Sequence, residues 1–161
     1  MYMKQLTLSI IALFILTACK TTHTVNDSHI KLCEKTIHDY IQYRDLGPIE
    51  QYQALFTADA TFSVPKLNIA LNTSEAIANR AKKALMTKKS IHMITSTNIK
   101  LLSQNTYSNV SHFVLHLSDK NTPNAKRKIF NGRYVDTLVI QNDQCLIKTR
   151  NVLIDRMDTL P

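Results

Sequence analysis

Two histidines with a spacing that could bind a metal ion are the first residues with chemistry to consider. His112 and His116 are four residues apart, and on a helix that spacing brings two imidazoles to one zinc ion. The segment that contains them is instead typical of a strand, where residues four apart share a face but lie about 13 Å apart at ~3.3 Å per residue. No other grouping of Cys and His has ligand spacing. We therefore expect no metal site.

Glycine is scarce, because the 161 residues contain only Gly47 and Gly132. Loops that cradle phosphate groups need several glycines so that the backbone can approach the ligand closely. The chain also has no Ser-His-Asp order and no Cys-His nucleophile signature. These absences exclude most nucleotide-binding classes, and we expect no cofactor.

Asp136 lies in the last predicted hairpin, with its side chain expected on the inward face. A turn centred on residues 142–143 pairs Asp136 with Thr149 and Tyr134 with Asn151. In this register Tyr134, Asp136 and Asn151 are candidate pocket residues at the polar end of an apolar face, and a slip of one residue would invert that face. A buried carboxylate must be hydrogen-bonded or paired, so Asp136 is either a structural residue or an acid that binds a ligand.

The elements that position these side chains follow from the hydrophobic periodicity. A helix is expected from His29 to the break at Gly47–Pro48, and Tyr40 on its apolar face is a further candidate pocket residue. This order of helices followed by antiparallel strands predicts an α+β fold with the helices on one face of the sheet. The other predicted helices span residues 48–57 and 73–86, and the predicted strands span residues 60–64, 91–102, 107–117, 128–140 and 144–154.

The first eighteen residues have the pattern of an export signal. Lys4 precedes an apolar run over residues 6–16, which is too short to cross a bilayer, where about 20 residues are needed. The run ends in LTAC at residues 16–19, which resembles the lipobox of bacterial lipoproteins. That resemblance implies that Cys19 is lipidated and becomes the first residue of the mature chain.

Lys20, which follows the cysteine, resembles the pattern of lipoproteins sorted to the Gram-negative outer membrane. We therefore expect an outer-membrane lipoprotein whose domain faces the periplasm and whose contact with the membrane is the lipid anchor. The expected organisation is a signal peptide at residues 1–18, a lipidated cysteine with a polar tether at 19–28, and one domain at 29–158.

The chain is basic, with 20 Lys and Arg against 12 Asp and Glu and a net charge of +8. Such a charge raises the question of nucleic acid. The basic residues are scattered and have no aromatic residues between them, and an exported protein seldom meets nucleic acid. We expect no nucleic-acid partner, and an anionic membrane surface or an acidic ligand fits the charge better.

Two cysteines remain once Cys19 is set aside. Cys33 lies on the apolar face of the first predicted helix, and Cys145 points to the sheet face that this helix should cover. An exported compartment permits a disulfide between them, provided that their Cα atoms come within about 7 Å. The alternative is that both are small hydrophobic core residues.

Several short motifs resemble one family when their order is considered. Residues 55–62, LFTADATF, resemble a signature of SnoaL-like domains in the nuclear transport factor 2-like superfamily, which includes scytalone dehydratase and ketosteroid isomerase. The segments SEAI at 74–77, IHMIT at 91–95 and GRYVD at 132–136 agree with it, as does Arg150. The resemblance implies a cone-shaped half-barrel, in which a curved sheet wraps a long helix around an apolar cavity. In many relatives a core Trp stands where this chain has Cys145.

The same resemblance suggests three catalytic candidates. Asp45 matches a pocket carboxylate of scytalone dehydratase-like members, His92 matches a pocket histidine, and His116 falls near a second one. The chain departs from the dehydratase pattern at Arg44, where that enzyme has tyrosine, and near Leu138, where it has asparagine. Asp45 and His92 are therefore either an acid–base pair or structural residues.

Three functions remain open at this stage. The first is binding of a small apolar or amphipathic ligand of unknown identity in the cavity. The second is a cofactor-free lyase or isomerase, such as a dehydratase, that uses Asp45 and His92. The third is a protein-interaction module that forms a homodimer through the outer face of the sheet. Convergence of Asp45 and His92 at an open cavity would favour the enzyme.

Overall fold

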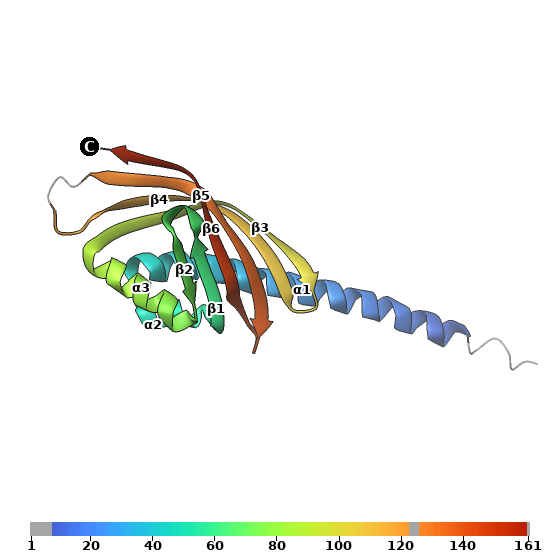
Figure 1. The fold of residues 1–161 in the computed structure, drawn as a ribbon. Coiled ribbons are helices and arrows are strands. Elements are labelled where there is room, and N and C mark those ends of the chain that lie inside the picture. Colours follow the sequence, from blue (N-terminus) through green and yellow to red (C-terminus); the bar gives the residue numbers. More distant parts are fainter. Residues whose placement is uncertain (1–7, 123–125, 161) are drawn as a thin grey trace, which may run out of the picture.

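Three helices precede and interrupt a six-stranded sheet in the computed structural model (Figure 1). It describes the backbone of residues 8–122 and 126–160, and side chains from Asn26 onward within those ranges. The elements are α1 (Leu8–Leu46), α2 (Ile49–Ala54), β1 (Phe56–Val64), a 3-10 turn (Pro65–Leu67), β2 (Ile69–Asn72), α3 (Ser74–Thr87), β3 (Lys88–Ser103), β4 (Thr106–Asp119), β5 (Arg127–Gln141) and β6 (Gln144–Leu160).

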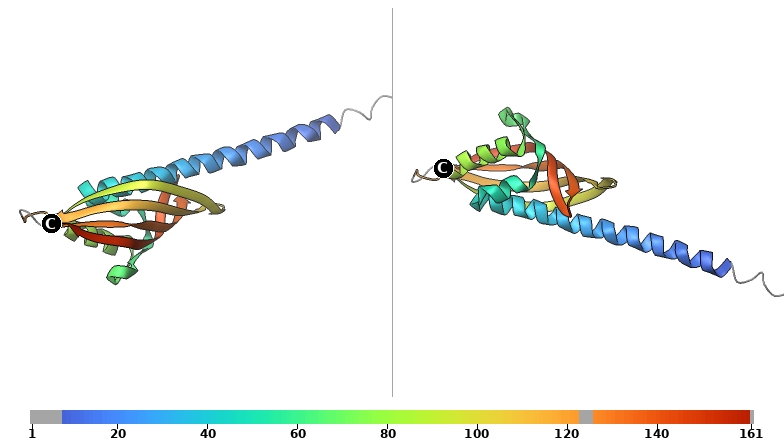
Figure 2. Two further views of the ribbon diagram at one scale, coloured as in Figure 1. Left: turned by 90° about the horizontal axis from the view of Figure 1, so that it is seen from above. Right: turned by 90° about the horizontal axis from the view of Figure 1, so that it is seen from below.

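The strands form one curved, unclosed sheet in the order β2-β1-β6-β5-β4-β3. Neighbouring strands are antiparallel except for β1 and β6, which run parallel. The sheet arches over the C-terminal part of α1, over α2 and over α3 (Figures 1 and 2). The expected α+β half-barrel, with the N-terminal helices on one face of a curved sheet, is therefore confirmed.

Helix α1 begins far ahead of the predicted His29 and extends beyond the sheet (Figure 2). The segment 19–28, expected as a tether, is therefore helical. Residues 1–7 of the predicted signal peptide and the side chain of Cys19 lie outside the described residues, so the lipoprotein signal stays a prediction. Among the described residues, no helix combines the length and the hydropathy that crossing a membrane requires.

The last hairpin turns where the sequence predicts but changes register four residues later. Asn142 and Asp143 have φ values of 49° and 57°, as the tight turn requires, and Ile140 pairs with Cys145. A bulge then shifts the pairing between Thr137 and Leu138, because β6 contains one extra residue there. From Thr149 to Ile154, the side chains of β6 therefore lie on the face opposite to the predicted one, up to a second shift of register between Ile154 and Arg156.

This bulge corrects the predicted pocket. Asp136 pairs with Arg150 rather than with Thr149, and the buried Arg150 lies on the inward face. Asn151 pairs with Val135 and accepts a hydrogen bond from Ser63 at 3.0 Å, so the prediction that Asn151 lines the pocket is wrong. Val152 is buried on the inward face of the sheet, like Arg150. It therefore does not contribute to the apolar residues of the outer face.

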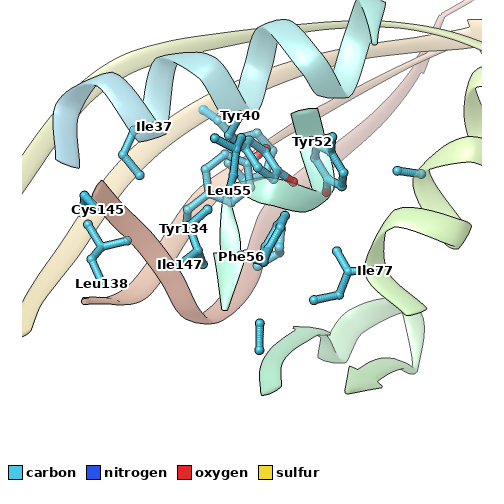
Figure 3. Close-up of a cluster of buried hydrophobic side chains, with 14 of the residues drawn as sticks. Ile37, Tyr40, Tyr52, Leu55, Phe56, Ile77, Tyr134, Leu138, Cys145 and Ile147 are labelled. Carbon is cyan, nitrogen blue, oxygen red and sulfur yellow. The ribbon is translucent and has the colours of Figure 1, made fainter. Parts of the chain in front are cut away.

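The core fills the space between the helices and the concave face of the sheet (Figure 3). Tyr40 of α1 meets Tyr52 of α2 and Tyr134 of β5, with ring centroids 5.3 and 5.5 Å apart. The structure joins Cys33 of α1 and Cys145 of β6 by a disulfide, with Cα atoms 5.0 Å apart. The C-terminal half of α1 is thus fixed to the sheet by aromatic packing and by a covalent bond.

Candidate functional site

Asp45 collects three hydrogen-bond donors at the C-terminal end of α1. Oδ1 accepts from the Ser90 hydroxyl at 2.6 Å and lies 2.5 Å from Nδ1 of His92, while Oδ2 accepts from the His92 backbone N–H at 2.6 Å. Ser90 and His92 are two residues apart on β3, so their side chains share the face that points inward toward the helix. One carboxylate therefore fixes the position and the ring orientation of His92.

The hydrogen bond also fixes which ring nitrogen of His92 is basic. An ionised carboxylate only accepts hydrogen bonds, so Nδ1 of the neutral imidazole carries the proton and Nε2 carries the free lone pair. Burial lowers the pKa of His92 below its ordinary value, although the hydrogen bond and the charge of Asp45 act in the opposite direction. His92 is therefore neutral at pH 7 and can accept a proton at Nε2.

The ionised form of Asp45 is favoured despite its partial burial. Burial alone would raise the pKa of this carboxyl, but its hydrogen bonds with His92 and Ser90 and the nearby imidazole outweigh that effect and lower the pKa. Asp45 can therefore act as the charged hydrogen-bond acceptor that orients the ring, and the neutral ring of His92 can act as the base. The side chains of His92 and Asp45 are 5% and 11% exposed, so bulk water hardly screens the pair.

His92 lines a cavity of about 160 Å³ beneath the curved sheet. Tyr40 and Tyr134 belong to its wall, as expected, whereas Asp45 lies behind His92 and contributes no lining. The wall is otherwise mostly apolar; it includes Phe62, Val64, Leu67, Ile69, Phe113, Leu115, Leu117, Phe130, Val152 and Ile154, with Arg44, Arg80 and Ser90 as further polar members.

His116 is not brought to the dyad. It follows Leu115 and precedes Leu117 on β4, and both leucines line the cavity. Side chains alternate along a strand, so His116 lies on the outer face, opposite His92. The structure therefore places one histidine at the cavity and does not bring His116 to it, so a catalytic role of His116 stays a prediction that this geometry does not support.

Asp136 belongs to a buried ion pair next to the cavity rather than to its wall. Nε and Nη2 of Arg150 donate to the two carboxylate oxygens of Asp136 at 2.8 and 2.7 Å, and Nδ2 of Asn109 donates to Asp136 at 2.8 Å. Both side chains of the ion pair are 0% exposed. The guanidinium lies over the rings of Tyr40 and Tyr134, 3.8 and 4.4 Å from their centroids.

The register expected from the sequence paired Asp136 with Thr149, so it did not predict the partnership of Asp136 with Arg150. Burial disfavours the charged guanidinium, yet the charge and hydrogen bonds of Asp136 keep the pKa of Arg150 above its ordinary value. Arg150 therefore supports the two tyrosines of the cavity wall from below. The segment GRYVD at residues 132–136 contains Asp136, and both this segment and Arg150 agree with the family motifs. Their joint occurrence in the sequence was a signal for the ion pair.

The described residues hold no group of three or more His, Cys, Asp or Glu side chains arranged to bind a metal ion. The cavity itself presents an oriented imidazole in mostly apolar surroundings, with two arginines in its wall.

Comparison with known families decides the lineage. The family model of SnoaL-like domains matches residues 29–151. The chain belongs to the SnoaL-like family. The match covers the C-terminal part of α1, the helices beneath the sheet, the dyad and the first part of β6, so the resemblance read from the short motifs is confirmed for this SnoaL-like protein.

Solved structures share the SnoaL-like fold. One is a protein from Novosphingobium aromaticivorans assigned as a scytalone dehydratase (20% identity, TM-score 0.73, 86% of this chain and 90% of that one). Another is a hexachlorocyclohexane dehydrochlorinase from Novosphingobium barchaimii (10% identity, TM-score 0.71, 81% and 88%). A third is ActVI-ORFA from Streptomyces coelicolor (17% identity, TM-score 0.60, 78% and 96%). A search of curated protein sequences finds no match.

Proposed function

We propose that this SnoaL-like protein is a cofactor-independent lyase or isomerase that removes a proton from carbon in a small apolar or amphipathic substrate. The observation that carries the proposal is the 2.5 Å contact between Asp45 and Nδ1 of His92 at the wall of an apolar cavity. This arrangement supplies a general base whose orientation, tautomer and charge state are already set before substrate binds.

The base in this proposal is Nε2 of His92. It takes a proton from a carbon made acidic by a neighbouring electron-withdrawing group, and the electrons of the C–H bond form a new C=C bond. In an elimination the leaving group departs from the adjacent carbon with its electrons, and a departing hydroxide receives the proton from the imidazolium as water. In an isomerisation there is no leaving group, so the π electrons of the electron-withdrawing carbonyl move onto its oxygen as the new C=C bond forms. When the carbonyl forms again, an existing C=C bond shifts and takes the same proton from the imidazolium at a different carbon.

Asp45 acts as a positioning residue in both versions. Its negative charge stabilises the imidazolium that exists while His92 holds the proton. Its contacts with the backbone N–H and with Nδ1 of His92 prevent the ring from rotating. The apolar wall excludes water, so the carbanion-like species is not diverted. Structural neighbours whose names denote elimination chemistry, a dehydratase and a dehydrochlorinase, agree with this proposal at the level of the fold.

The test measures proton removal rather than a guessed product. The protein is incubated in deuterated buffer with a β-hydroxy ketone that bears a phenyl ring on the hydroxyl carbon, and NMR follows exchange at the carbon between the two oxygen-bearing carbons. Ultraviolet absorption follows formation of the conjugated enone. We expect exchange above the buffer rate that falls by about 10²–10⁴ in His92→Gln.

His116→Gln is the matched control, because His116 lies on the outer face, and it should exchange like the unmodified protein. Equal exchange in His92→Gln and the unmodified protein would contradict the proposal. Failure of exchange across a panel of ketones, esters and halides would favour the second candidate.

The second candidate is a carrier that binds a small apolar ligand without turnover. It is favoured by the mostly apolar lining of the cavity. Native mass spectrometry of the protein purified from cells distinguishes the two. A retained molecule that is released unchanged, together with absent exchange, supports the carrier.

We also propose that the protein acts in the bacterial envelope, attached to the outer membrane through lipid on Cys19. The support is the sequence LTAC at residues 16–19 followed by Lys20. Cys19→Ser should move the protein from the membrane fraction to the soluble fraction and remove the lipid mass from its N-terminal peptide. Unchanged membrane association in this variant would contradict the anchor.

A further inference from the structure

The mouth of the cavity is basic. Arg44, directly before Asp45 on α1, and Arg80 on α3 both belong to the cavity wall. The same two arginines line an adjoining hollow of about 570 Å³ together with Lys83 and Lys88. We name these four residues the basic vestibule. Neither the cavity nor the hollow has an Asp or Glu among its lining residues.

Most of this positive charge has no acidic partner. Lys88 forms an ion pair with Asp119, but among the described residues no ion pair involves Arg44, Arg80 or Lys83. Arg150 offers a contrast, because its guanidinium is held by Asp136 on two sides. The charges of Arg44, Arg80 and Lys83 are therefore available to a ligand, whereas the charge of Arg150 is paired with Asp136, although its buried Nη1 has no hydrogen-bond partner among the described residues.

The cavity and the vestibule together define a ligand with two different ends. A cavity of about 160 Å³ is close to the roughly 150 Å³ that accommodates a benzene ring in an apolar protein interior. Arginines at its mouth match the oxygen atoms of carboxylates and phosphates, and positive charge around a mouth raises the rate at which anions arrive.

We propose that the substrate is an organic anion with an apolar body about one ring in size, whose carboxylate or phosphate group is bound by Arg44 and Arg80 while its body fills the cavity beside His92. This inference rests on the proposed function, since it makes the bound anion the substrate of the dyad. Because Arg44 and Asp45 are consecutive residues of α1, the same helical turn fixes both the anion and the base that acts on the body.

Arg44 also acts on the base, because it is a permanent cation close to His92. The charge of Arg44 further disfavours protonation of His92, and a bound anion would offset that effect. The negative charge of the substrate thus balances the positive charge of Arg44 beside His92.

The test compares matched probes on the full-length protein by isothermal titration calorimetry at low salt. Benzoate and phenyl phosphate carry the anion, benzamide is the neutral match for benzoate, and inorganic phosphate lacks the ring. We expect benzoate or phenyl phosphate to bind at least about tenfold more tightly than benzamide and inorganic phosphate. The tighter of the two anions identifies the group that the arginines prefer, and added salt should weaken its binding.

Variants assign the effect to the vestibule. Arg44→Gln and Arg80→Gln should each weaken anion binding by about tenfold and leave benzamide binding unchanged. Lys82→Gln is the matched control, because Lys82 is an exposed cation on α3 that lines neither hollow, and it should bind like the unmodified protein. Equal thermal midpoints show that the variants fold.

The outcomes separate this inference from the proposed function. Anion binding that persists in His92→Gln, with no proton exchange in any protein, retains the anion site and rejects the enzyme. Equal binding of benzoate and benzamide, or anion binding unchanged in Arg44→Gln and Arg80→Gln, overturns the inference whatever the exchange assay shows. Equal binding of inorganic phosphate and phenyl phosphate overturns the role given to the cavity.

Discussion

At the scale of single residues, the behaviour of His92 depends on two opposing influences. Burial favours the neutral ring, and Asp45 favours the charged one. Burial prevails, so the base is ready at pH values where an exposed histidine would be partly protonated. The carboxylate of Asp45 partly offsets the effect of burial on the pKa of His92, and it also orients the ring. Its removal should therefore change both the rate of proton removal and the pH dependence of that rate, and the two changes can be measured separately.

The pH dependence of proton exchange should report this balance. In the unmodified protein the activity should rise with pH and reach half of its plateau below the ordinary histidine value of 6.5, because the pKa of His92 is lowered. Asp45→Asn should lower the plateau rate by about 10²–10⁴. It should also move the acid limb to still lower pH, since the charge that raises the pKa is lost. The measurement is the exchange rate between pH 4 and 8, and an upward shift of the limb in Asp45→Asn would contradict this explanation.

Arg150 and Asp136 should show the cost of a half-broken buried ion pair. Arg150→Met removes the cation that is paired with the buried Asp136 carboxylate, and we expect a loss of about 3–5 kcal/mol in the free energy of unfolding. Urea denaturation measures the loss. The double variant Arg150→Met with Asp136→Leu should recover much of it, because no uncompensated charge then remains. A double variant as unstable as the single one would show that the tyrosine contacts dominate.

At the scale of elements, the packing of α1 against the sheet depends on a few long-range contacts. Asp45 attaches its C-terminal end to β3, Tyr40 packs on β5, and the Cys33–Cys145 disulfide attaches its middle to β6. The cavity lies under the part of the helix that these contacts fix. Loss of one contact should therefore weaken the fold without changing which elements form.

The disulfide permits a direct measurement of this attachment. Cys33→Ser with Cys145→Ser should lower the free energy of unfolding by about 2–4 kcal/mol, because the unfolded chain gains the freedom that the cross-link removed. Guanidinium denaturation with and without reductant measures the change, and intact mass shows whether the two thiols have lost their protons. A reductant effect of the same size in the double variant would assign it to another cause.

Sequence patterns predicted the long elements well and the fine register poorly. Apolar periodicity located the end of α1 and most ends of the four long strands within a few residues, but it missed the N-terminal part of α1. The bulge in β6 was missed because the segment around Arg150 is polar on both faces, so no hydrophobic alternation specified the register. The short strand β2 was missed because four residues behind Pro65 carry little signal. The face on which His116 lies could be assigned only once the pairing of β4 was known. A short family motif does not contain this information.

At the scale of the whole molecule, stability should follow the protonation of the dyad. The pKa values of His92 and Asp45 are both lower in the folded state than the ordinary 6.5 and 3.8. A lowered folded pKa means that the unfolded chain binds the proton more readily, so stability is complete above the ordinary value and falls as the pH falls through the folded one.

We therefore expect the thermal midpoint to decrease on acidification below pH 6.5. The first part of this decrease comes from His92, and the part below 3.8 comes from Asp45. Calorimetric scans from pH 8 to 3 measure the midpoint. His92→Gln should flatten the first part, and His116→Gln should not. A midpoint that rises on acidification between 6.5 and 5 would contradict the sign of the shift.

The central place of β6 in the sheet has a consequence for the order in which the molecule forms. The strand that lies between β1 and β5, and that contributes Cys145, Arg150 and Val152, is the last one made. Before β6 is made, β1 and β5 lack their shared neighbour. β6 pairs with β5 as a hairpin, which can form locally, whereas its pairing with β1 joins residues 88 to 91 positions apart. We therefore expect the two parts of the sheet to join late, when the C-terminal hairpin meets β1.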